Sequence, residues 1–138
     1  MNVQKIISEI PYADQLGLKL VESNSQGLVF CLLPEERFIG NPVAEAFHGG
    51  VICGFMECSM SLTIMNLLKI NKPPPLINQT TSFLGSASIK SPLYVQTEIT
   101  KPGKRIVGAY ARTYQDNKEL LVAKSSSLFR LDLDSDGA

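Results

Sequence analysis

One carboxylate stands alone in a long apolar stretch of this sequence. Between Gly49 and Asn66, Glu57 is the only residue with a formal charge. A buried, unpaired carboxylate is costly, so Glu57 either faces solvent, pairs with a basic side chain from a strand, or lines a cleft as a general base or nucleophile. Partial burial would raise its pKa toward neutrality, which favours the third role.

The residues that precede the apolar stretch could stabilise an anion. They are His48-Gly49-Gly50, and glycines let the backbone approach a ligand closely. The first turn of a helix adds free N–H donors and a partial positive charge, so we expect an oxyanion hole here. Gly50 and Glu57 are seven residues apart and share one side of a helix. His48 could take part, or could only cap the helix or pack in the core.

Asn41 is a further candidate in the segment before His48. Its amide could position a water molecule or the reacting group, or it could be a turn residue ahead of Pro42. No G-x-S-x-G motif is present, and the chain has one histidine, so the sequence does not indicate a serine nucleophile with its own histidine base.

The elements that must position these residues follow from the sequence pattern. We expect a short helix over residues 2–9 ended by Pro11 and a long loop over residues 34–47. A second helix should run from about Gly50 to Ile70 and stop at the three consecutive prolines 73–75. Strands are expected at Leu18–Glu22, Leu28–Leu33, Leu76–Leu84, Leu93–Thr100, Ile106–Tyr114 and Leu120–Leu131. Strands and helices do not alternate, which predicts an α+β fold with one antiparallel sheet.

The long helix is apolar almost all round and must be covered on nearly every side. A sheet curled around it, with a second subunit over the remainder, would do so. Residues 49–68 are also long enough to span a membrane. We favour a buried core helix, because Glu57 lies near the middle, two glycines begin the stretch, and no Trp, Tyr or basic cluster precedes it.

Composition limits the class of protein. The 138 residues predict a single domain over 1–138, and 13 basic and 13 acidic side chains give no general attraction for nucleic acid or acidic membranes. Three cysteines and one histidine do not suit a structural metal site, and Cys53 and Cys58 have apolar neighbours typical of packing. No secretion signal is recognisable, which predicts a cytoplasmic protein. The acidic residues 132–137 match half of a calcium loop without its glutamate, so a solvated tail is expected.

These motifs resemble one known family. Phe38-Ile39-Gly40-Asn41, His48-Gly49-Gly50-Val51-Ile52 and Glu57 resemble the hotdog-fold thioesterases of the phenylacetate-pathway type. The later segments Ser82-Phe83-Leu84, Gly103-Lys104-Arg105-Ile106 and Leu121-Val122-Ala123-Lys124 are similar to the strand pattern of that family. The resemblance extends from about Leu18 to Leu131.

The resemblance implies a long central helix wrapped by a curled antiparallel sheet. It also implies homodimers with paired sheets, often assembled into dimer-of-dimers tetramers, with active sites at the subunit interface. The catalytic residues of the family correspond to Asn41, His48, Gly50 and Glu57. Many members carry aspartate where this chain has Glu57, so the choice between nucleophile and general base stays open.

Coenzyme A contacts are implied at two places. One is the segment Gly85, Ser86 and Ala87, and the other is the turn after the fourth strand, which contains Lys104 and Arg105. Three cations within residues 101–105 suit phosphate, although a solvated hairpin turn would look the same. Coenzyme A enters as part of the substrate, and no separate cofactor is expected.

The function expected from these features is hydrolysis of an acyl-CoA thioester. An alternative within the fold is dehydration of a hydroxyacyl thioester, although Arg37 stands where those enzymes need a histidine base. A third possibility is a module that binds acyl-CoA without turnover. The acyl group is not fixed, because apolar candidates such as Phe55, Met56 and Met60 suit aryl and aliphatic chains alike.

Overall fold

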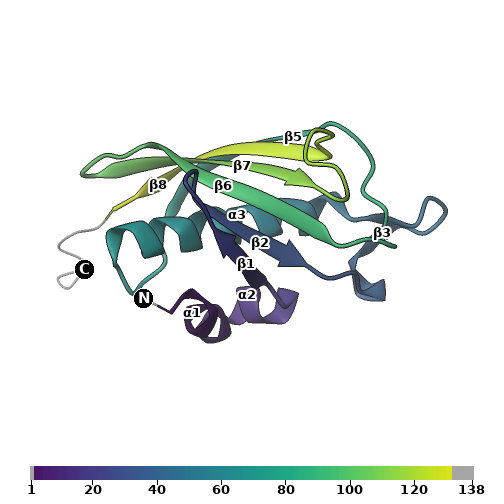
Figure 1. Ribbon diagram of the computed structural model, residues 1–138, viewed down its shortest axis with the longest axis horizontal. Helices are drawn as coiled ribbons and strands as arrows, with labels where there is room; N and C mark the ends of the chain where they lie inside the picture. Colours follow the sequence, from purple (N-terminus) through teal and green to yellow (C-terminus); the bar gives the residue numbers. More distant parts are fainter. Residues whose placement is uncertain (1, 132–138) are drawn as a thin grey trace.

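A long helix lies against a six-stranded antiparallel sheet in the computed structural model, which describes residues 2–131 (Figure 1). The central helix is α3 (Gly49–Leu68), and the sheet curves over it. Two short helices, α1 (Val3–Glu9) and α2 (Pro11–Leu16), lie near the β1 edge of the sheet and contact α3. The acidic residues 132–137, with their partial calcium-loop pattern, lie outside the described residues.

The strand segments confirm the predicted α+β layout. The sheet has the order β1-β2-β6-β7-β8-β5, and every neighbouring pair is antiparallel. Its strands are β1 (Lys19–Ser23), β2 (Leu28–Leu32), β5 (Leu76–Phe83), β6 (Leu93–Lys101), β7 (Ile106–Tyr114) and β8 (Ala123–Arg130). The last strand begins three residues later than predicted, because Asn117 organises a turn that includes Leu120.

The concave face of the sheet packs on α3, which is the core helix. Its side chains from Phe55 to Met65 are buried apart from the half-buried Glu57. Several polar side chains on this face find partners, although the buried Thr113 hydroxyl has none among the described residues: the Thr63 and Thr97 hydroxyls are 2.6 Å apart, and Ser127 donates to the Met60 sulfur at 3.0 Å. The helix has the length and hydropathy of a membrane span, but most of it is buried inside the chain, as predicted.

Two segments differ from the sequence prediction. Pro11 does not only end the first helix; it begins α2, because the first position of a helix needs no N–H donor. Gly17 then ends α2 with a φ of 73°, a left-handed conformation that favours glycine.

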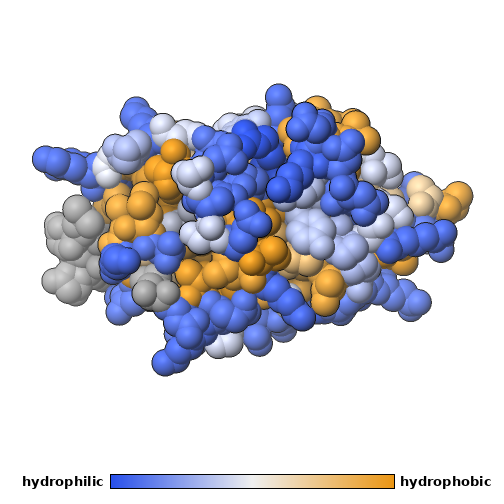
Figure 2. Space-filling model, in the orientation of Figure 1, coloured by the Kyte–Doolittle hydropathy of each residue, from blue (hydrophilic) through white to orange (hydrophobic). Residues whose placement is uncertain are grey.

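The predicted loop 34–47 also contains regular structure. It holds the 3₁₀ turn η1 (Glu36–Phe38) and a small hairpin of β3 (Ile39–Asn41) and β4 (Ala46–Phe47). At the right-hand end of the molecule this hairpin projects, and Figure 2 shows apolar side chains there. The hairpin positions the chain that enters α3.

The two edges of the sheet are not equivalent. At the β1 edge, Gln4 of α1 accepts a hydrogen bond from Leu20 N–H and donates to the Leu18 carbonyl, so the edge is partly covered. The β5 edge is eight residues long and has no neighbouring strand within residues 2–131. Large apolar side chains are exposed on it or directly after it, namely Leu76, Ile77, Phe83 and Leu84. Long open edges of this kind invite pairing with another strand.

Candidate active site

Glu57 lies in the middle of α3 and is half-buried. Among the described residues it forms no ion pair with a lysine or an arginine. Its one hydrogen-bonding contact there is a long one, 3.9 Å, from the Cys58 thiol to Oε1. The carboxylate is therefore neither in open solvent nor neutralised by a cation from residues 2–131, which leaves it available to react.

The protonation of this region follows from burial. Burial raises the pKa of the Glu57 carboxyl above its ordinary value, and the Cys58 thiol offsets part of that rise. Burial, followed by the nearby Glu57 charge, raises the pKa of Cys58 to about 12, so this thiol stays protonated and is a poor nucleophile. Within residues 2–131, no three His, Cys, Asp or Glu side chains are grouped as a metal site would require.

His48 is the N-cap of α3. Its Nδ1 accepts a hydrogen bond from Gly50 N–H at 2.8 Å, and its carbonyl accepts from Val51 and Ile52 N–H. The capping role that the sequence left open is therefore present in the structure. The His48 side chain is also exposed. Gly50 N–H is engaged in this arrangement, whereas Gly49 N–H has no acceptor among the described residues. Gly49 therefore presents the open donor at this helix end.

Asn41 occupies the turn of the small hairpin. Its Oδ1 accepts hydrogen bonds from Val43 N–H at 3.0 Å and Ala44 N–H at 3.1 Å, which is an Asx turn. The side chain is exposed, and its neighbour Gly40 packs against His48 so closely that a Cβ would come 2.6 Å from the His48 Cα. Asn41 thus lies near the histidine, with its oxygen committed to the turn.

Strand β5 borders the N-terminal half of α3. Gln79 donates to the Cys53 carbonyl at 3.2 Å, and the Cys53 thiol donates to the Thr81 hydroxyl at 3.2 Å. Nearer the start of the helix, a Cβ at Gly49 would lie 3.3 Å from the Phe83 ring, which is 53% exposed. Cys53 is one turn before Glu57, so the carboxylate lies close to the open β5 edge.

The two segments expected to bind coenzyme A lie at opposite ends of the sheet. Gly85 and Ser86 are exposed just after β5, while Ala87 is buried and its carbonyl accepts from Phe47 N–H at 2.8 Å. Lys104 and Arg105 are exposed in the β6–β7 turn.

The strand register fixes the distance between these segments. Phe83 pairs with Ala123, which in turn pairs with Thr113 at one end, and Ile106 pairs with Arg130 at the other. Seven residues of extended strand separate the two ends, about 20 Å or more. One protomer does not bring both segments together.

Sequence reasoning missed one side chain beside Glu57. Tyr12 of α2 lies across α3 at Gly54, where a Cβ would overlap the phenol oxygen and come 3.0 Å from a ring carbon. Two signals could have indicated this contact. Pro11 and Gly17 are typical start and stop residues of a helix, and a glycine inside a helix often marks a close approach.

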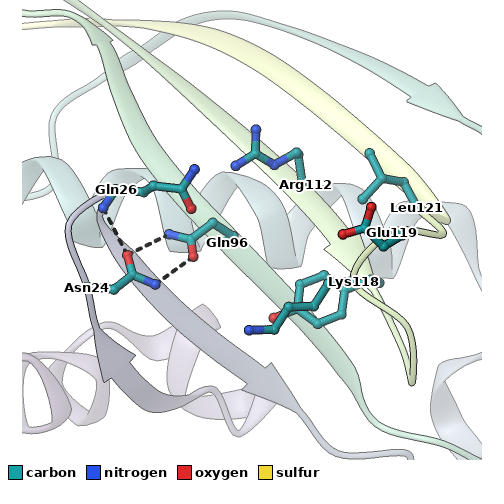
Figure 3. Close-up of a pocket in the computed structure, with 8 residues that line it drawn as sticks. Asn24, Gln26, Gln96, Arg112, Lys118, Glu119 and Leu121 are labelled. Carbon is teal, nitrogen blue, oxygen red and sulfur yellow. Dashed lines mark hydrogen bonds between the residues drawn. The ribbon is translucent and has the colours of Figure 1, made fainter.

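A polar pocket of about 330 Å³ lies on the other face of the sheet (Figure 3). It is lined by Asn24, Gln26, Gln96, Arg112, Tyr114, Lys118, Glu119 and Leu121. Asn24 and Gln96 exchange two hydrogen bonds, of 2.8 and 3.2 Å, at its wall. No residue predicted for catalysis or for coenzyme A lines this pocket, so it is separate from the Glu57 site.

Comparison with known proteins assigns the family. Residues 40–129 match the family model of the acyl-CoA thioesterase N-terminal domain. Among curated proteins, none has a sequence that matches this chain.

Solved structures assign the fold. A protein from Chromobacterium violaceum is 28% identical, with a TM-score of 0.73 over 94% of this chain and 88% of that one. A putative thioesterase from Ralstonia eutropha, described as phenylacetic acid degradation-related, is 17% identical, with a TM-score of 0.80 over 94% and 98%. Thioesterase superfamily member 2 from Mus musculus is also 17% identical, with a TM-score of 0.79 over 94% and 95%. The chain therefore has the hotdog fold and belongs to the acyl-CoA thioesterase family.

Proposed function

We propose that this thioesterase hydrolyses acyl-CoA at Glu57, which either attacks the thioester carbonyl or activates a water molecule. The observation that carries the assignment is a half-buried carboxylate without a cation partner in the described part of the chain, on the same helix as the glycine-rich start of α3. Burial holds the pKa of this carboxyl above its ordinary value, nearer to the range that suits a base at neutral pH.

The start of α3 would stabilise the charge that develops on the carbonyl oxygen. We predicted Gly50 N–H as the donor, but His48 already accepts that hydrogen bond. Gly49 N–H is open, and Gly50 would join it once the His48 side chain turns away. The balanced reaction adds water across the C–S bond to give a carboxylic acid and the coenzyme A thiol, and it requires no further cofactor.

We further propose that the active form is a homodimer, or a dimer-of-dimers tetramer, joined through β5. The support is the open eight-residue edge with four exposed apolar side chains, close to the Glu57 side of α3. A two-fold axis would pair β5 with its copy in antiparallel fashion and place two α3 helices at one interface. Each Glu57 would then face the partner subunit.

The same dimer would complete the coenzyme A site. Antiparallel pairing turns the Gly85 end of one protomer toward the β6–β7 end of its partner, where Lys104 and Arg105 are exposed. Neither cation forms an ion pair among the described residues, so both are available for phosphate groups.

The dehydratase alternative gains no support at Arg37. This side chain forms an ion pair with Glu35 at 2.7 Å, donates to the Gln15 carbonyl and lies 4.8 Å from the centre of the Phe38 ring. These contacts join α2 to η1, and an arginine does not supply the histidine base that dehydration needs.

Thiol release from a panel of aryl and aliphatic acyl-CoAs tests the proposal. Wild type should release the thiol, and Glu57→Ala should lower the rate by about 10² to 10⁴, the range for loss of a general base. Glu36→Ala removes an exposed carboxylate elsewhere and should leave the rate unchanged.

Other outcomes would refute hydrolysis at Glu57. Equal rates in wild type and Glu57→Ala would remove the assigned residue. Hydration of crotonyl-CoA without thiol release would favour the dehydratase alternative, and tight binding without turnover would favour a binding module.

A further inference from the structure

Tyr12 packs against the outward side of α3, in a notch on the surface of that helix. The notch is Gly54, at which any side chain would collide with the phenol of Tyr12. Glycine inside a helix is less stable than alanine, so its presence here is explained by the close approach of Tyr12.

Helix α2 holds Tyr12 on a fixed support. Its Ala13 and Leu16 side chains are buried in the core, and Gly17 ends the helix with two backbone hydrogen bonds. Arg37 of η1 also donates a hydrogen bond to the Gln15 carbonyl of α2. With this anchoring, the phenol stays over α3 although 48% of the residue is exposed.

The notch and the carboxylate lie on one face of α3. Gly54 and Glu57 are three residues apart, which makes them neighbours on a helix surface. The titratable groups around Glu57 are Tyr12 from α2 and Cys53 and Cys58 from α3. Strand β5 presents uncharged Gln79 and Thr81 to this part of the helix.

Both polar groups lack a strong partner. The Tyr12 hydroxyl makes no hydrogen bond within residues 2–131, and Glu57 accepts only from the Cys58 thiol at 3.9 Å. Burial, and then the nearby Cys58, Glu57 and Cys53, raise the pKa of Tyr12, so the phenol keeps its proton and remains a donor. A neutral donor and an under-bonded carboxylate on one face are complementary.

We propose that Tyr12 is a positioning residue of the active site, whose hydroxyl donates a hydrogen bond to the Glu57 carboxylate in the assembled enzyme. This bond orients the carboxylate and favours its ionised form, the form needed for attack or for base catalysis. The catalytic part of the inference rests on the proposed function, while the contact itself requires neither substrate nor turnover.

A titration of Glu57 tests the contact without any substrate. In protein labelled with ¹³C at the glutamate carboxyl carbon, the NMR signal that Glu57→Gln removes reports the protonation of this residue. Loss of the phenol donor in Tyr12→Phe should raise the pKa of Glu57 by about half a unit to one unit. Tyr110→Phe, on the opposite face of the sheet, is the matched control and should leave the Glu57 pKa unchanged.

Gly54→Ala provides a second variant that keeps the tyrosine. Its methyl group displaces the phenol, so the Glu57 pKa should rise as in Tyr12→Phe, and the double variant should add little to either change. Because Ala favours the helix, this variant also covers the case in which Tyr12→Phe folds poorly.

Kinetics connect the contact to catalysis. The acid limb of kcat/KM should move to higher pH in Tyr12→Phe by the same amount as the NMR titration, with KM for acyl-CoA largely unchanged. An unmoved Glu57 titration in both Tyr12→Phe and Gly54→Ala overturns the inference, even if wild type is an active thioesterase. A moved titration in a protein that releases no thiol leaves the contact standing and refutes the proposed function.

Discussion

The two sides of α3 have opposite chemistry. The sheet-facing side carries bulky, fully buried side chains such as Phe55 and Met56, and even its Thr63 hydroxyl has a partner across the sheet. The outward side carries Gly50, Gly54 and the half-buried Glu57. In the part of the helix up to Glu57, one side therefore supplies packing, while the other gives up packing to hold a charge beside small residues. The residues that stabilise the fold and the residue proposed to react therefore lie on opposite sides of the same helix.

The largest effect is expected on the packing side. Leu62→Ala removes a side chain that is 1% exposed and should lower the free energy of unfolding by about 2–5 kcal/mol, since a cavity remains. Leu67→Ala makes the same change at a residue that is 53% exposed and should lower it by less than about 1 kcal/mol. Urea denaturation measures both variants. Similar losses of unfolding free energy in the two variants would show that the buried and exposed positions of α3 do not differ in their contribution to stability.

The open edge beside the outward side can be tested by charge. Lysines at Thr80 and Ser82, both exposed on β5, would bring four like charges to the edge shared by a paired copy, where they repel each other. We expect the double variant to elute as a monomer in size-exclusion chromatography and to lose about tenfold or more of the activity. Ser126→Lys changes the residue paired with Thr80 on the interior strand β8 and is the control. An active monomer would contradict an active site completed across β5.

A smaller effect is expected at the start of the helix. His48→Ala removes the acceptor of the Gly50 N–H and should lower the free energy of unfolding by about 1 kcal/mol. His48→Asn offers another capping oxygen and should recover most of this loss. Thermal unfolding of the two variants measures the difference. If alanine and asparagine behave alike, the histidine contributes nothing as a cap.

The sequence was sufficient for the elements that packing dictates. An apolar stretch too long for a strand predicted α3, and runs of β-branched and aromatic residues predicted β6 and β7 almost to the residue. The lone charge in that stretch also indicated Glu57 as the residue to examine, because a single charge within an apolar stretch is visible in sequence alone.

The parts that depend on contacts between distant segments were not predictable. Nothing adjacent to Tyr12 in the chain indicates that α2 crosses α3 at Gly54. The hydrogen bond from Gly50 to His48 depends on one rotamer, and it changes which glycine N–H is open. The separation of Gly85 from Arg105 follows from strand register, which short motifs do not encode.

The pH dependence of stability gives a signature of Glu57. The folded state holds this carboxyl at a raised pKa, so the folded protein binds the proton more tightly than the unfolded chain does. The contribution of Glu57 to stability therefore decreases as pH rises from the ordinary glutamate value near 4.5 to the raised value, and then stays low. Glu57→Gln removes this dependence and should match or exceed wild type in stability at neutral pH.

The most direct measurement combines activity and stability in Glu57→Gln. We expect thiol release from acyl-CoA to fall by at least about a hundredfold while the urea midpoint at pH 7 stays equal or rises, because an uncompensated half-buried charge has been removed. Retained activity would contradict the central claim that Glu57 carries the chemistry. A large drop in the midpoint would show instead that the carboxylate stabilises the fold.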